Sequence, residues 1–133
     1  MDAPSPDSDR GIEVSIRVRY AECDAMGYLH HGKYWEYFEE VRTALLRARG
    51  VRYRDLEARG VFFVVYKCSC KYRLPIRYDD LVDVRVWITR RSRTRIDHAY
   101  TISRQGQVCC EAATTLACVG RNGRPIVMPD ELW

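Results

Sequence analysis

A chain of 133 residues is long enough for one domain with a modest core and too short for two. Its composition, 47% hydrophobic and 30% charged, is ordinary for a soluble globular protein, and no apolar run approaches the ~20 residues that span a bilayer, which excludes membrane insertion. The net charge of +4 suits an anionic partner, but no zinc-finger, P-loop or similar motif is present, so we expect no nucleic acid partner.

The N-terminus and the cysteines indicate the compartment. Residues 1–10 are polar and lack the apolar core of a signal peptide, so we expect a mobile tail, a single domain over 11–133 and a cytoplasmic location. The cysteine pattern, Cys-x-Cys at 68–70 and an adjacent pair at 109–110, fits neither a disulfide framework nor a zinc site. We therefore expect most of the six cysteines to be reduced, buried, small hydrophobes, and we expect no metal.

The first half of the chain predicts one strand and one long helix. Residues 12–20 alternate apolar and polar side chains, which is typical of a half-buried strand. From 31 to 49 the apolar side chains recur every three or four positions and form one helical stripe, which consists of Tyr34, Phe38, Val41, Leu45 and Ala48. Gly50 marks the end of this helix, and a short helix over 53–59 follows.

The second half predicts β-structure. Four strands separated by polar turns are expected, at 62–74, 81–89, 95–104 and 108–119. In the first of them we expect alternate residues to share one face, namely Phe62, Val64, Tyr66, Cys68, Cys70, Tyr72 and Leu74. His98 lies on an apolar strand face and is interpreted as a core histidine with its hydrogen bonds satisfied. The order of elements predicts an α+β fold, in which an antiparallel sheet of about five strands wraps around one long helix.

One segment near the start of the long helix carries the candidate chemistry. A strand-like run ends at a lone carboxylate, and a glycine turn, a histidine pair and the helix follow; the positions concerned are Tyr20, Asp24, Gly27, His30, His31 and Tyr34. This order places an acid beside a helix N-terminus, where free backbone N–H groups can hold a developing oxyanion. The segment is therefore the candidate active site.

The same segment resembles the signature of the 4-hydroxybenzoyl-CoA thioesterase family of hotdog-fold acyl-CoA thioesterases. That family shows an aromatic residue, an Asp, a Gly, a His near the helix start and a second aromatic, which here are Tyr20, Asp24, Gly27, His31 and Tyr34. The resemblance extends over nearly the whole chain. It implies a hotdog fold, hydrolysis of an acyl-CoA or aryl-CoA thioester without a cofactor, and a homodimer or homotetramer whose pocket lies between subunits.

The resemblance assigns roles, and each role has a plain alternative. Asp24 takes the family's catalytic position, as a nucleophile or as the base that activates water; the alternative is an aspartate of a turn or helix cap. His31 is expected to act on Asp24 or the thioester, with its backbone N–H as the oxyanion donor, or else to be a surface or capping residue. His30 is expected to line the pocket, and the remaining motif positions are expected to bind substrate: Tyr20, Gly27 and Tyr34.

Charged residues outside the motif also have a functional interpretation and a plain alternative. Arg93 and Arg95 belong to a basic hairpin that suits the phosphates of coenzyme A, and the alternative is a solvated turn. Glu39 lies near the core stripe of the helix, but a salt bridge to Arg42 is the favoured interpretation. Lys33 stands where many relatives have Asn, and is either a cation at the pocket mouth or a solvated side chain.

Three rival functions remain open. The first rival is a hotdog hydratase or dehydratase, but the spacing from Asp24 to His31 does not match the usual hydratase pattern. A second rival keeps the chemistry and releases an acyl or polyketide chain from acyl carrier protein, which the sequence does not distinguish from CoA. The third is a non-catalytic acyl-binding module, in which Asp24 would be dispensable.

Overall fold

The computed structural model describes residues 11–132, so the tail expected at 1–10 lies outside the described residues. Residues 11–132 fold into five strands, two α-helices and two 3₁₀ helices. In chain order these are β1 (Ile12–Arg17), η1 (Tyr20–Glu22), α1 (His31–Ala48), α2 (Tyr53–Ala58), β2 (Phe62–Tyr72), β3 (Leu81–Arg91), β4 (Arg95–Arg104), β5 (Gln107–Val119) and η2 (Asp130–Leu132). Between residues 11 and 132 no helix is long and apolar enough to cross a membrane.

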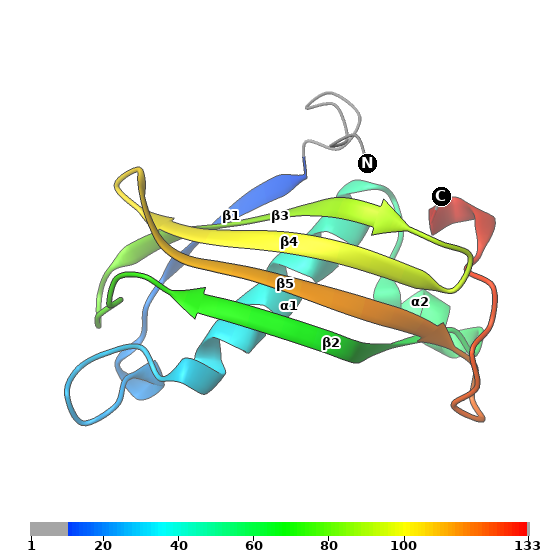
Figure 1. Ribbon diagram of the computed structural model, residues 1–133, viewed down its shortest axis with the longest axis horizontal. Coiled ribbons are helices and arrows are strands. Elements are labelled where there is room, and N and C mark those ends of the chain that lie inside the picture. Colours follow the sequence, from blue (N-terminus) through cyan, green and yellow to red (C-terminus); the bar gives the residue numbers. More distant parts are fainter. Residues whose placement is uncertain (1–10, 133) are drawn as a thin grey trace.

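The strands form one antiparallel sheet in the order β1-β3-β4-β5-β2. The helix α1 lies across one face of this sheet, and β1 and β2 form its two edges (Figure 1). Short turns connect β3 to β4 and β4 to β5, as the turn residues predict. The arrangement of one sheet around one long helix is the predicted α+β fold.

The core fills the space between α1 and the inner face of the sheet. The apolar stripe of α1 supplies the buried side chains of Tyr34, Tyr37, Phe38, Val41 and Leu45. Strands β3 and β4 alternate as predicted, and their buried residues are Val82, Val84, Val86, Ile88, Ile96, His98, Tyr100 and Ile102. Full burial of each aliphatic or aromatic side chain stabilises the fold by about 1.5–3 kcal/mol. Beyond α1, Gly50 has a φ of 81°, which fits the predicted helix end.

The first strand is shorter than predicted. Strand β1 ends at Arg17 instead of continuing to residue 20. The chain turns into η1 because the side chain of Glu22 accepts a hydrogen bond from the backbone N–H of Arg19 at 2.9 Å. Tyr20, predicted on the buried face of a strand, is therefore 79% exposed.

The predicted single face of β2 is wrong because the strand contains a bulge. Val65 lies opposite Leu116, but Lys67 lies opposite Thr115, so one extra residue shifts the alternation. The side chains on the helix side are consequently Phe63, Val65, Cys68, Cys70 and Tyr72, without the predicted Phe62, Val64 and Tyr66. Helix α1 leaves part of this side uncovered, since Val65 is 55% and Tyr72 49% exposed.

The cysteines differ in their surroundings. All six are free thiols. Cys109, Cys110 and Cys118 are buried, as the small-hydrophobe interpretation expects, whereas Cys68 is exposed. Cys68 is exposed because it lies on the uncovered side of β2.

Candidate active site

Asp24 closes a tight loop at one end of the sheet. Its carboxylate Oδ1 accepts hydrogen bonds from the backbone N–H groups of Met26 at 2.9 Å and Tyr28 at 3.1 Å. Gly27 has a φ of 82°, a left-handed conformation that favours glycine. Asp24 is thus a turn aspartate, as the alternative interpretation expected. Its side chain is also exposed, and no group in residues 11–132 donates a hydrogen bond to Oδ2, so this oxygen is open to water or substrate.

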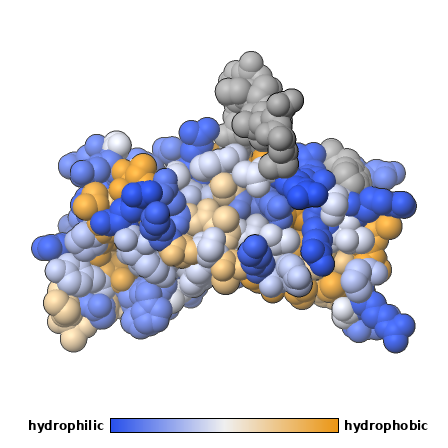
Figure 2. Space-filling model, viewed as in Figure 1, coloured by the Kyte–Doolittle hydropathy of each residue, from blue (hydrophilic) through white to orange (hydrophobic). Residues whose placement is uncertain are grey.

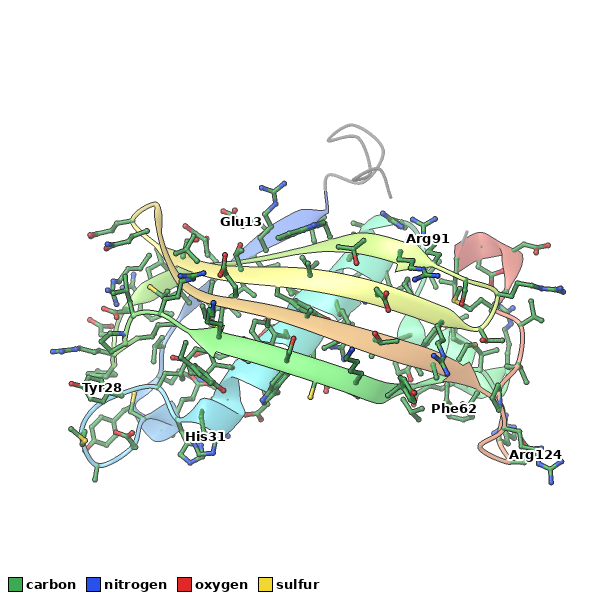
Figure 3. All side chains as sticks on the ribbon, in the orientation of Figure 1. Glu13, Tyr28, His31, Phe62, Arg91 and Arg124 are labelled. Atoms are coloured by element: carbon green, nitrogen blue, oxygen red, sulfur yellow. The ribbon has the colours of Figure 1, made fainter. Side chains whose placement is uncertain are left out.

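The start of α1 lies at the same end of the molecule (Figure 3). His30, not His31, caps the helix: its Nδ1 accepts a hydrogen bond from the N–H of Gly32 at 3.1 Å, and its carbonyl oxygen accepts one from the N–H of Lys33 at 2.9 Å. The exposed ring of His31 stacks on His30, with ring centroids 4.2 Å apart. Among the described residues nothing accepts the N–H of His31, so the predicted oxyanion donor is available.

The Asp24 loop and the helix start belong to one short antiparallel ribbon. The N–H of Asp24 donates to the carbonyl oxygen of Tyr28 at 2.8 Å, and the N–H of His30 donates to that of Glu22 at 2.9 Å. His31 lies three positions after Tyr28, which corresponds to roughly 10 Å along the ribbon. The acid and the N–H donor therefore share one small surface region.

Glu22 supports this region and was missed by the sequence analysis. It is 6% exposed and accepts hydrogen bonds from the Tyr37 hydroxyl at 2.8 Å and the Arg19 backbone N–H at 2.9 Å. Burial opposes its charge, but these hydrogen bonds and the Arg19 guanidinium hold the pKa of Glu22 below its usual value. Glu22 therefore ties the turn before Asp24 to α1. The available signal was the three-residue spacing from Arg19 to Glu22, which lets an acidic side chain accept the backbone N–H at the start of a helical turn.

The two aromatic residues of the motif lie in different surroundings. Tyr20 is exposed beside the Asp24 loop and packs edge-on against Tyr78, with centroids 5.5 Å apart. Tyr34 is 4% exposed and packs edge-on against Tyr72 of β2 at 4.9 Å. Burial raises the pKa of the Tyr34 hydroxyl. Tyr34 is therefore a core residue beneath the helix start, whereas Tyr20 borders the open loop.

Arg93 and Arg95 lie at the opposite end of the sheet from Asp24. The Asp24 loop pairs with the segment that precedes β3, and Arg104, the last residue of β4, reaches the same segment. Arg95 is the first residue of β4. At ~3.3 Å per residue, the two ends of this strand are about 30 Å apart. A single chain thus does not bring the predicted arginines to the predicted acid.

Arg95 borders a basic cleft of about 300 Å³ on the outer face of the sheet. The cleft is lined by Tyr66, Lys67, Arg90, Ser92, Arg95, Asp97 and Thr115. The Arg95 guanidinium lies over the Tyr66 ring, 4.3 Å from its centroid. Arg93 does not line the cleft. Three cations against one carboxylate give this cleft the charge that a phosphate ligand requires.

The remaining sequence expectations concern charged and polar residues. Within residues 11–132, Arg42 donates to the Tyr100 hydroxyl at 3.1 Å and forms no salt bridge with Glu39, so that expectation is wrong. Lys33 forms an ion pair in the first turn of α1, where it is solvated. His98 is 5% exposed, but its buried Nδ1 has no hydrogen-bond partner in the described part of the chain, contrary to prediction. Nowhere in residues 11–132 do three metal-binding side chains come together.

Comparison with known proteins identifies the family. A family model described as the thioesterase-like superfamily matches residues 18–133. The chain belongs to this superfamily. Acyl-CoA thioester hydrolase YbgC of Escherichia coli O6:H1 is similar to this thioesterase-like chain, at 31% identity over 105 residues, which are 78% of each chain.

Solved structures agree with the family assignment. A protein of Thermus thermophilus has a TM-score of 0.86 at 34% identity, covering 90% of this chain and 92% of that one. The DHNA-CoA thioesterase of Staphylococcus aureus has a TM-score of 0.84 at 32% identity, covering 86% and 78%. These findings confirm the predicted hotdog fold and the predicted class of enzyme, a thioester hydrolase.

Proposed function

We propose that this member of the thioesterase-like superfamily hydrolyses an acyl-CoA to the free acid and CoA, with Asp24 as its catalytic residue. The observation that carries the proposal is the open Oδ2 of an exposed Asp24 in the same surface region as the unengaged N–H of His31 at a helix N-terminus. A carboxylate and an N–H donor of this kind are the two groups that thioester hydrolysis needs.

The mechanism uses the two groups in turn. As a base, Asp24 takes a proton from a water whose oxygen attacks the thioester carbon; as a nucleophile, it attacks that carbon itself and water then releases the acid. In both routes negative charge develops on the carbonyl oxygen, and the His31 N–H stabilises it together with the positive end of the helix dipole. The C–S bond then breaks, and CoA leaves as a thiolate that takes up a proton.

The complete site is proposed to form between two protomers paired along β2. Strand β2 is an edge of the sheet, and edge strands tend to pair with another chain. It exposes the apolar side chains of Val64, Val65 and Tyr66, and Figure 2 shows hydrophobic surface along the lower edge, where Figure 1 places β2. In the proposed pair, a two-fold axis passes near Lys67, in the middle of β2, and the two β2 strands lie antiparallel. The Arg95 end of one protomer then lies near the partner's Asp24.

The basic cleft is proposed to bind the nucleotide of CoA. It lies at the end of the sheet that this pairing brings toward the partner's Asp24. Lys67, Arg90 and Arg95 supply positive charge for the phosphates, and Tyr66 offers an aromatic face for the adenine ring. Arg93, the other predicted phosphate ligand, lies outside the cleft, so Arg90 takes its place in the proposal.

The test is a panel of alkyl and aryl acyl-CoA thioesters with free thiol release measured over time. Catalysed release from at least one class is the expected result, and it should require the intact Asp24. Tight acyl-CoA binding with no release from any thioester would favour the non-catalytic acyl-binding module instead.

Acyl carrier protein is the second candidate carrier of the acyl group. The specific observation in its favour is the basic cleft, which would also attract an acidic carrier. Matched acyl-CoA and acyl-carrier substrates, compared by kcat/KM, distinguish the two. A cytoplasmic location goes with both candidates, because free cysteines suit a reducing compartment.

A further inference from the structure

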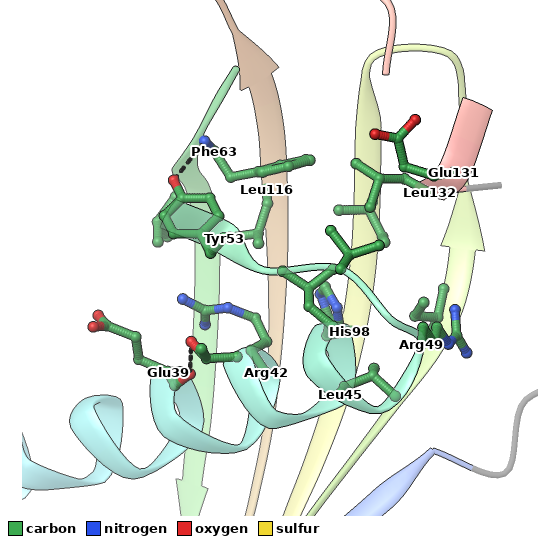
Figure 4. Close-up of a pocket in the computed structure, with 16 residues that line it drawn as sticks. Glu39, Arg42, Leu45, Arg49, Tyr53, Phe63, His98, Leu116, Glu131 and Leu132 are labelled. Atoms are coloured by element: carbon green, nitrogen blue, oxygen red, sulfur yellow. Dashed lines mark hydrogen bonds between the residues drawn. The ribbon is translucent and has the colours of Figure 1, made fainter. Parts of the chain in front are cut away.

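A second cavity, of about 270 Å³, lies between the C-terminal half of α1 and the sheet. Its walls are mostly apolar and include Leu45, Val51, Phe63, Val65, Ile96 and Leu116. Figure 4 shows α1 on one side of this space and Tyr53, Phe63 and Leu116 on another. Because a water occupies about 30 Å³ in the liquid, the cavity has room for about nine groups of that size.

The cavity has a polar floor. His98 lines it with a residue exposure of 5%, and its Nδ1 has almost no accessible surface and no bond to any described residue. Burial, together with the charges of Arg42, Arg49 and Arg91, lowers the pKa of His98 to about 3. The ring is therefore neutral near pH 7, with one nitrogen that donates and one that accepts a hydrogen bond.

Arg42 completes the polar floor. It lines the cavity and uses one N–H group on the Tyr100 hydroxyl, at 3.1 Å, while a guanidinium carries five. The lining residues carry two cations, Arg42 and Arg49, and two carboxylates, Glu39 and Glu131, so their formal charges cancel, although Glu131 is also bonded to Arg59 outside the cavity. A ligand group that complements the neutral His98 ring and the Arg42 guanidinium must both donate and accept a hydrogen bond, and a hydroxyl is such a group.

The position of the cavity connects it to the proposed active site. Phe63 and Val65 of β2 form part of its wall. In the proposed antiparallel pairing about Lys67, this part of β2 lies beside the partner's Tyr72, which packs at the start of the partner's α1. An acyl chain whose thioester is held at the partner's Asp24 can therefore extend into this cavity.

We infer that the cavity binds the distal part of the acyl group and selects an apolar chain that ends in a hydroxyl, which bonds to His98 and Arg42. The inference rests on the proposed thioesterase function and on the shared site. A site built to bond a hydroxyl rejects the analogue without it, because its own buried polar groups then stay unpaired.

The experiment compares 8-hydroxyoctanoyl-CoA with octanoyl-CoA. We expect kcat/KM to be roughly tenfold or more higher for the hydroxylated substrate, and we expect His98→Leu to reduce this ratio to about one. His98→Gln, which keeps a donor and an acceptor, should recover part of the preference. Arg95→Ala is the matched control, since it lies in the other cleft and should leave the ratio unchanged.

A second readout does not depend on turnover. The chain has three histidines, so the imidazole signals of His98 can be assigned by NMR, and free 8-hydroxyoctanoate should shift them more than octanoate does. If no thioester is hydrolysed but this shift appears, the proposed function fails and the cavity assignment stands. Equal kcat/KM values for the two substrates, or a preference for the carboxylate-ended suberoyl-CoA, would overturn the hydroxyl selectivity.

Discussion

Oδ1 of Asp24 accepts two backbone N–H groups, whereas Oδ2 is open. Asp24→Asn keeps an oxygen that can accept both turn hydrogen bonds but removes the carboxylate. We therefore expect the variant to fold, with kcat reduced roughly a hundredfold or more, the usual scale for losing acid–base catalysis. Thiol release from acyl-CoA gives the rate, and circular dichroism gives the fold. Nearly unchanged turnover in a folded Asn variant would refute the role of Asp24.

Glu22 should matter for stability because its buried carboxylate is bonded to two elements. We expect Glu22→Gln to lower the free energy of unfolding at pH 7 by about 1–3 kcal/mol, as loss of a charged hydrogen-bond acceptor does. The folded pKa lies below the usual 4.5, so the carboxylate stabilises the fold above that pH and the contribution is lost as pH falls through the folded pKa. Urea unfolding at pH 7 and pH 3.5 should show the difference between wild type and variant shrink in acid. Tyr37→Phe, which removes one hydroxyl, should cost less.

Buried His98 should make the stability of the fold sensitive to acid at a higher pH than Glu22 does. Its folded pKa of about 3 lies below the unfolded value near 6.5, so the unfolded chain binds a proton that the folded chain does not. Stability is then complete above pH 6.5 and falls as pH decreases, by about 2 kcal/mol at pH 5. His98→Leu removes this dependence. Unfolding free energies measured from pH 7.5 to 5 should therefore fall more steeply for wild type, and parallel curves would contradict the assignment.

At the scale of the element, periodic patterns made most of the fold predictable. The stripe through Tyr34, Phe38 and Val41 gave α1, and the alternation of β3 and β4 gave the inner face, because burial of one face repeats along an element. The bulge at Tyr66 was not predictable, since one unpaired residue leaves no periodic trace and depends on the partner strand.

The candidate site was predictable where it is local in sequence. The turn at Asp24 and the helix start at His31 are set by neighbours a few residues away. Glu22 was missed because its partner Tyr37 lies 15 residues on, and the cleft around Arg95 because four strand segments assemble it. Long-range geometry of this kind needs the register of the sheet, which one sequence does not contain.

The basic cleft around Arg95 leads to a prediction at the scale of the element. We expect the double variant Arg90→Ala and Arg95→Ala to raise KM for acyl-CoA more than it lowers kcat, because phosphate contacts lie far from the reacting carbon and act as uniform binding. Steady-state kinetics with acyl-pantetheine, which lacks the nucleotide, should show a much smaller change. Arg93→Ala is the matched control outside the cleft. Equal losses on both substrates would mean that the arginines support the fold or the chemistry instead.

At the scale of the molecule, each chain carries the two halves of the proposed site at opposite ends. The Asp24 loop and the Arg95 cleft are separated by the length of β4, about 30 Å at ~3.3 Å per residue. The proposed pairing along β2 accounts for this separation. In an antiparallel pair, the Asp24 loop of each chain lies near the Arg95 end of the other, so the pair has two sites. The proposed pairing would also bring the partner's strand beside the apolar side chains of β2 that α1 leaves exposed.

The pairing predicts that Cys68→Glu dissociates the assembly and reduces activity. Cys68 is exposed next to the proposed axis at Lys67, so the substitution places two carboxylates close together across the interface. We expect wild type to be a dimer or tetramer by light scattering at micromolar concentration, and the variant to be a folded monomer with a much lower kcat/KM. Cys68→Ser is the neutral control and should retain the assembly and its rate. Because each monomer retains its own Asp24 and its own cleft, a monomer that hydrolyses acyl-CoA at the full rate would show that one chain holds a complete site.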